Sequence, residues 1–171
     1  SFSPDGMYTV VNREKGILGA DFAKEIEGAG ACIQAGEAGN LVPAGAAAWL
    51  PCTAAQAQAA VTAYSAPEGM RFTVSEEREG TCIRCKGRNA PSHSPARGVS
   101  AIQGLLHVIA GCEGAPGALR DAAGELLGLM GEQPDGAAMG IRCADDVSGE
   151  LTTNLGMLSL NDGMLTAKLD V

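Results

Sequence analysis

The sequence is poor in aromatic, basic and histidine residues, and it contains no long apolar run. Aromatic side chains make up 4% of the 171 residues, so the core must be built mainly from Leu, Val, Ile, Met and Ala. Lys and Arg number 12 against 20 Asp and Glu, which gives a net charge of −8. This balance disfavours nucleic acid and anionic membranes as partners, because both are bound through Lys and Arg. No apolar run approaches the roughly 20 residues that span a bilayer.

What remains is typical of a globular protein. Apolar residues make up 46% of the chain and charged residues 19%, a composition that argues against disorder. The length suits one ordinary domain or two small lobes that share a core. The 6 cysteines are spread through the chain without the density of a secreted disulfide scaffold, so we expect a reducing cytoplasm as the compartment.

Hydrophobic periodicity predicts strands and helices in mixed order. The predicted strands lie near residues 16–25, 30–35, 41–50, 70–75, 81–86, 151–160 and 164–171. The predicted helices lie at residues 53–64, 102–109 and 119–130, and residues 131–149 form a polar, Gly-rich loop. Helices between antiparallel pairs predict an α+β fold, with antiparallel sheets and helices packed on one face. The order is compatible with two ferredoxin-like lobes.

Local signals support several of these elements. Thr53 is a predicted helix N-cap before an Ala/Gln-rich run. Ile102, Leu105 and Ile109 fall on one stripe of the second helix. Asn161-Asp162-Gly163 predicts the turn of a C-terminal hairpin.

Few residues could carry chemistry. Cys82-x-x-Cys85 resembles a zinc or redox motif, but in a strand an offset of three sends the two sulfurs to opposite faces. We therefore interpret both as structural. His107 lies about 140° from Ile102 on the helical wheel, which predicts a solvated side chain without a role. His93 lies in a loop between a strand and a helix, where either a functional or a merely exposed histidine is expected.

Three motifs resemble one family. The Gly36…Asn40-Leu41-Val42-Pro43 turn resembles the Gly-x-x-x-Asn-x-Val-Pro turn in the lid domain of the zinc exopeptidase superfamily, which includes dipeptidase V, carnosinase, aminoacylase and carboxypeptidase G. Residues 87–102 resemble its Gly-x-x-Ala-His-small-Ser-x-Pro-x-x-Gly-x-Asn-Ala segment, and residues 149–156 its Gly-x-Leu-Thr-x-Asn-x-Gly hairpin. Residues 3–17 resemble the junction from catalytic domain into lid in the dipeptidase V branch.

The resemblance implies that residues 1–171 are a lid, or dimerisation, domain cut from a larger metallopeptidase. The parent enzyme would be a zinc-dependent dipeptidase that holds two zinc ions in a catalytic domain absent from this chain. The fragment alone would have no cofactor, no metal ligands and no activity. Its expected partners are its own catalytic domain and a dipeptide substrate, and both a monomeric and a homodimeric parent are compatible with it.

Two site residues follow from the motif positions. Asn40 would contact the substrate, and His93 would stabilise the oxyanion. The family's histidine aligns with Pro91, whereas His93 falls two places later. Either the loop is re-registered and His93 acts, or the chain has lost the donor. In the second case the domain would be a non-catalytic dimerisation or interaction module of a degenerate homologue.

Overall fold

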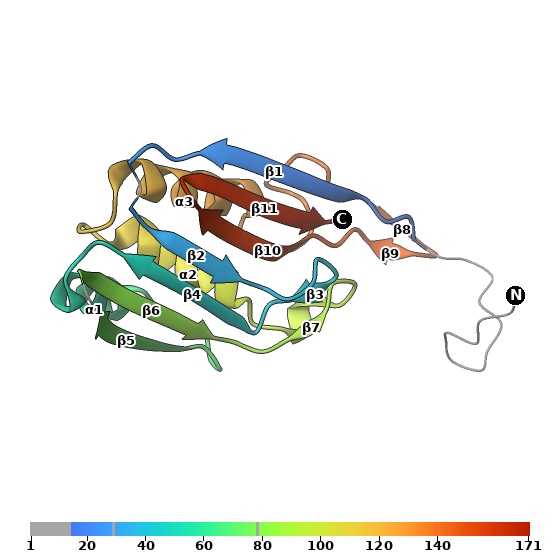
Figure 1. Ribbon diagram of the computed structural model, residues 1–171. Coiled ribbons are helices and arrows are strands. Elements are labelled where there is room, and N and C mark those ends of the chain that lie inside the picture. The colour runs from blue at the N-terminus through green and yellow to red at the C-terminus, as the bar shows by residue number, and fades with distance from the viewer. Residues whose placement is uncertain (1–14, 29, 78) are drawn as a thin grey trace, which may run out of the picture.

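A computed structural model describes residues 15–28, 30–77 and 79–171. Their main feature is a seven-stranded antiparallel sheet with the order β1-β11-β10-β2-β4-β6-β5 (Figure 1). The strands are β1 (Gly19–Glu25), β2 (Cys32–Ala35), β4 (Gly45–Leu50), β5 (Arg71–Glu77), β6 (Gly80–Lys86), β10 (Asn154–Asn161) and β11 (Met164–Asp170). The segment 3–14 of the predicted domain junction lies outside the described residues.

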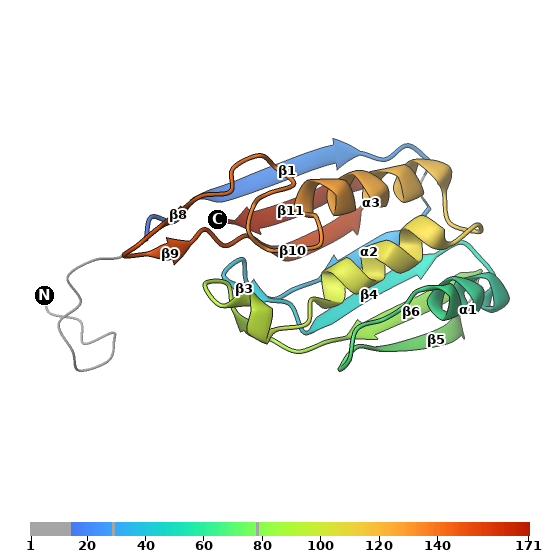
Figure 2. The same cartoon turned by 180° about the vertical axis from the view of Figure 1, so that it is seen from behind.

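Three helices cover one face of this sheet. They are α1 (Ala54–Ala63), α2 (Ala101–Gly111) and α3 (Gly117–Met130), and Figure 2 shows all three on the same side. The predicted α+β class, with antiparallel strands and helices on one face, is confirmed. All seven strands share one continuous sheet, and only β4, α1, β5 and β6 have the split βαβ order of a ferredoxin-like lobe.

Two short ladders lie outside the main sheet. β3 (Leu41–Val42) pairs with β7 (Ala90–Pro91), and β8 (Ala144–Asp145) pairs with β9 (Gly149–Glu150). A single turn of 3₁₀ helix, Pro95–Arg97, follows β7. The predicted strand 41–50 is therefore divided at Pro43 and Ala44, because Pro43 cannot donate to a ladder and the chain changes partner there.

The helix ends and the last turn follow the local sequence signals. Thr53 is the N-cap of α1, as predicted, and the structure adds a full capping box with Gln56. Ser100 caps α2 by accepting a hydrogen bond from the amide of Gln103 at 3.3 Å. The turn between β10 and β11 places Asp162 at φ 49° and Gly163 at φ 78°, the left-handed pair that a tight hairpin needs.

The core lies between the sheet and the helices. Its largest fully buried side chains include Ile33, Leu50 and Ile83 from the sheet. They face Ile102, Leu105, Leu106 and Ile109 on α2. Among the described residues, no helix has the length and apolar character needed to cross a bilayer.

Candidate functional site

The three family-like motifs meet around β3. In the second motif, Ala90 and Pro91 pair with Val42 and Leu41 of the first. The amide of Ser92 donates to the carbonyl of Asn40 at 3.0 Å. Gly98 also belongs to the second motif, and a Cβ on it would lie 2.7 Å from Cγ1 of Val42. Only a glycine allows this close approach.

The third motif supports the same turn from the sheet side. Asn154 is 5% exposed, and its Nδ2 donates to the carbonyls of Gly39 at 3.0 Å and Leu41 at 2.9 Å. A Cβ on Gly156 would overlap the backbone of Gly39, and one on Gly36 would overlap the carbonyl of Gly156. The first and third motifs therefore pack backbone against backbone, although more than 100 residues separate Asn154 from Gly39.

Asn40 and His93, the two predicted site residues, lie in neighbouring turns of this cluster. Asn40 immediately precedes β3, and His93 follows β7 by two residues. Both are exposed, and the hydrogen bond from Ser92 to Asn40 joins the two turns. Pro91, at the aligned position of the family's histidine, is held in the ladder opposite Leu41. The structure therefore brings Asn40 and His93 to one corner and offers no imidazole at position 91.

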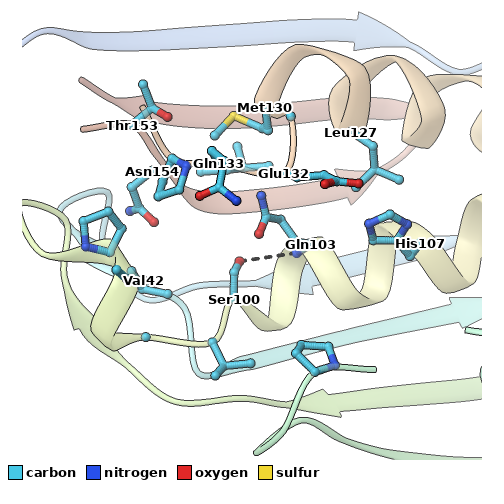
Figure 3. Close-up of a pocket in the computed structure, with 18 of the residues that line it drawn as sticks. Val42, Ser100, Gln103, His107, Leu127, Met130, Glu132, Gln133, Thr153 and Asn154 are labelled. Carbon is cyan, nitrogen blue, oxygen red and sulfur yellow. Dashed lines mark hydrogen bonds between the residues drawn. The ribbon is translucent and has the colours of Figure 1, made fainter. Parts of the chain in front are cut away.

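A pocket of about 530 Å³ opens beside this corner, between α2 and the segment that follows α3 (Figure 3). It shares Val42 and Gly98 with the motif cluster. Both apolar and polar side chains line its walls. The polar ones are Ser100, Gln103, His107, Glu132, Gln133, Thr153 and Asn154.

His107 lies on the α2 side of the pocket. Its side chain is exposed, as predicted, but its ring stacks on Tyr64 with the centroids 4.8 Å apart and an interplanar angle of 14°. Burial against this wall lowers the pKa of His107, and the Glu132 carboxylate opposes that shift. The lowered pKa favours the neutral imidazole, and the ring is packed on one face by Tyr64 rather than fully solvated.

The Cys82-x-x-Cys85 pair lies in the sheet with both side chains buried. Both lie in β6, where an offset of three residues directs their sulfurs to opposite faces of the sheet. Burial raises the pKa of Cys85 to about 12 and also raises that of Cys82, so neither thiolate is favoured. Among the described residues, no group of three or more His, Cys, Asp or Glu side chains lies together as a metal site would need.

For several residues of this region, the sequence gives no signal of the contacts that they make in the fold. Asn154 belongs to a motif, but its two hydrogen bonds to the β3 turn join distant segments. Glu132, Gln133 and Thr153 lie in or after the predicted polar loop, and nothing local indicates that they line a pocket. The only local signal for the burial of Thr153 is its position between Leu151 and Leu155.

No protein-family model matches the chain, and no curated protein matches it. The resemblance to exopeptidase lids therefore rests on the sequence motifs alone.

Proposed function

We propose that this chain is the substrate-capping lid domain of a zinc-dependent dipeptidase and acts together with a catalytic domain that it does not contain. The observation that supports the proposal is the convergence of three separate lid-like motifs on β3, with Asn40 and His93 exposed at that corner. The close contacts at Gly36, Gly98 and Gly156 explain why the motifs need glycine there. They do not explain why Asn40 and His93 are exposed at the same corner.

The proposed roles follow from the chemistry of the two side chains. The carboxamide of Asn40 can donate to the terminal carboxylate of a dipeptide. The imidazole of His93 can donate to an oxyanion that develops at the scissile carbonyl. Hydrogen bonds from Asn154 hold the backbone of the Asn40 turn, and the β3–β7 ladder ties this turn to the one that carries His93. Such support keeps a donor in place without reorganisation.

The zinc ions belong to the proposed catalytic domain. The described residues offer no ligand cluster, so both ions would be held by other polypeptide, where they would polarise the peptide carbonyl and activate water. This chain would contribute substrate contacts and closure. A cytoplasmic location, a dipeptide substrate and a monomeric or homodimeric parent belong to the same proposal.

Two observations favour a second candidate. Pro91 lies in a ladder position and cannot supply the imidazole that the family places there. The edge strand β1 and the residues before it expose Ile17, Leu18 and Phe22, whose exposed fractions are 85%, 63% and 42%. A dimerisation or interaction module without a role in catalysis would use such a surface.

The genomic sequence on either side of this segment tests the proposal first. His-x-Asp and Glu-Glu zinc-ligand motifs are expected on both sides, and their absence would rule out the parent enzyme. The complete protein is then assayed against a dipeptide panel. Asn40→Ala should lower kcat/KM about tenfold or more, because a hydrogen bond to a charged group is lost.

Matched variants separate the two candidates. Gln58→Ala removes an exposed carboxamide from α1, which lies at the opposite end of the sheet from β3 (Figures 1 and 2), and should leave kcat/KM unchanged. His93→Ala should lower kcat more than it raises KM if the imidazole meets the transition state. If Asn40→Ala and His93→Ala both match the Gln58 control, the lid proposal fails and the module remains.

A further inference from the structure

The pocket beside the motif corner has the size and wall chemistry of a small-molecule site. Its volume of about 530 Å³ falls within the range of known ligand pockets. Helix α2 forms one wall, and the end of α3 with residues 131–134 forms the other. Figure 3 shows Gln103 on the α2 side and Glu132 and Gln133 across the hollow from it. Apolar side chains such as Val42, Leu127 and Met130 complete the lining.

One buried side-chain oxygen in this lining has no hydrogen-bond partner among the described residues. Thr153 is 1% exposed, and its Oγ1 makes no hydrogen bond to any described residue. A buried hydroxyl without a partner costs about 1–3 kcal/mol, so it is rarely kept in a wall that only has to pack. Its backbone amide is paired with the carbonyl of Pro134 at 2.9 Å, which fixes the residue beside the segment that closes the pocket.

The electrostatics of the pocket favour a cation. Glu132 is the one carboxylate among the described lining residues, and they include no Lys or Arg. The C-terminal end of α3 also lies here, since Leu127, Met130 and the C-cap Gly131 are lining residues. Helix C-termini carry partial negative charge. The stacked rings of Tyr64 and His107 add an aromatic surface to the α2 wall on the other side of the pocket.

We propose that this pocket binds a small molecule that carries a primary ammonium group next to an amide. The ammonium group is held at the Glu132 end, by that carboxylate and the end of α3. The amide pairs with the carboxamides of Gln103 and Gln133, which offer both donors and acceptors. The apolar lining accepts an aliphatic side chain. Amino-acid amides and the amino-terminal ends of short peptides have this chemistry.

The proposed pocket site does not depend on the lid proposal. Neither Asn40 nor His93 lines the pocket, and binding can be measured on this chain alone. If the lid proposal fails, the pocket proposal is unaffected. If no ligand binds in the pocket, the lid proposal is likewise unaffected.

Calorimetric titration with three probes tests the site. L-leucinamide has the ammonium, the amide and an aliphatic side chain, N-acetyl-L-leucinamide lacks the charge, and L-leucine replaces the amide by a carboxylate. We expect saturable binding of L-leucinamide and an affinity at least about tenfold lower for each of the other two probes. N-acetyl-L-leucinamide loses the ion pair with Glu132, and the carboxylate of L-leucine brings a like charge close to Glu132. Chemical shifts should move at the side-chain amides of Gln103 and Gln133.

Two glutamate variants provide the control. Glu132→Gln keeps the shape of the side chain, removes its charge and should reduce L-leucinamide affinity about tenfold while N-acetyl-L-leucinamide is unaffected. Glu113→Gln removes an exposed carboxylate that does not line the pocket and should change neither affinity. Equal binding of the charged and acetylated probes, indifference to Glu132→Gln, or no saturation by about 10 mM L-leucinamide would overturn the proposal.

Discussion

Thr153 and Thr81 are both buried, but only the hydroxyl of Thr81 makes a hydrogen bond among the described residues. Thr81 is 0% exposed and donates to the carbonyl of Cys52 at 2.7 Å, whereas Thr153 Oγ1 has no partner among the described residues. Thr→Val keeps the shape and removes the hydroxyl. We expect Thr153→Val to raise the free energy of unfolding by about 1 kcal/mol and Thr81→Val to lower it by about 1–2 kcal/mol.

Urea unfolding of the two valine variants checks this contrast. Equal losses of stability in both would show that the hydroxyl of Thr153 is satisfied. A gain at Thr153 would instead show that the pocket wall keeps a polar group at a cost in stability, as functional sites often do.

Cys85 gives the chain a dependence on alkaline pH. Its pKa rises from 9.0 to about 12 on folding, because burial disfavours the thiolate. Above pH 9 the unfolded thiol releases its proton while the folded one retains it, so deprotonation favours unfolding. The contribution of the protonated Cys85 thiol to the unfolding free energy is fully present below pH 9, and it is lost as the pH rises toward the folded-state pKa of about 12. At about pH 10.5 the loss from this thiol is about 2 kcal/mol.

The measurement is the unfolding free energy of the wild type and of Cys85→Ala at several pH values. The variant should be less stable at pH 8, because it leaves a cavity, but should lose about 2 kcal/mol less on going to about pH 10.5. Cys143→Ala, at an exposed cysteine, is the matched control and should keep the wild-type slope. A Cys85→Ala slope equal to that control would contradict the assignment.

At the scale of elements, close backbone contacts hold the turn before β3 against β10. An added Cβ at Gly156 would overlap the backbone of Gly39, which cannot move without breaking the hydrogen bonds from Asn154. We expect Gly156→Ala to cost about 2 kcal/mol or more. Gly124 is exposed on α3, and a Cβ added there would meet nothing within 4 Å, so Gly124→Ala should stabilise by about 0.5–1 kcal/mol.

Chemical unfolding of the two alanine variants measures the difference, and amide exchange at residues 39–42 localises it. Faster exchange in Gly156→Ala confined to that turn is expected, because the β10 support is lost there first. If both alanine variants stabilise the protein, the backbone contact between the two motifs does not exist as described.

For the whole molecule, the parts predicted from the sequence are those governed by neighbours in the chain. The N-cap at Thr53 and the hairpin turn at residues 161–163 depend on four or fewer consecutive residues, and both are confirmed. The insertion of β2 between β10 and β4, and the pairing of β3 with β7, depend on contacts between distant segments. Periodicity carries no information about such pairings.

The candidate site divides in the same way. Motif positions selected Asn40 and His93, and the structure places them in adjoining turns, but their roles stay predictions. The pocket was not predicted, because its walls come from α2 and from a loop after α3 that the sequence identified only as polar. Glu132 has an ordinary sequence context, and only the folded chain shows that it is the one carboxylate among the described residues of that wall.

The last prediction concerns zinc and the chain as a whole. His93 lies in the turn after β7, whereas His107 lies in α2. Cys82 and Cys85 are buried in β6 with raised pKa values, and the described residues form no ligand cluster. A metal present at about 100 times its Kd would stabilise a folded site by about 2.7 kcal/mol, which a thermal scan resolves easily. We expect zinc to leave the melting temperature of this chain unchanged and to produce no dipeptide hydrolysis. Replacing the exposed Cys32 and Cys143 by Ser removes adventitious binding by free thiols. Stoichiometric zinc retained by that double variant, with chelator-sensitive hydrolysis, would mean that the chain is an enzyme by itself and that the lid proposal is wrong.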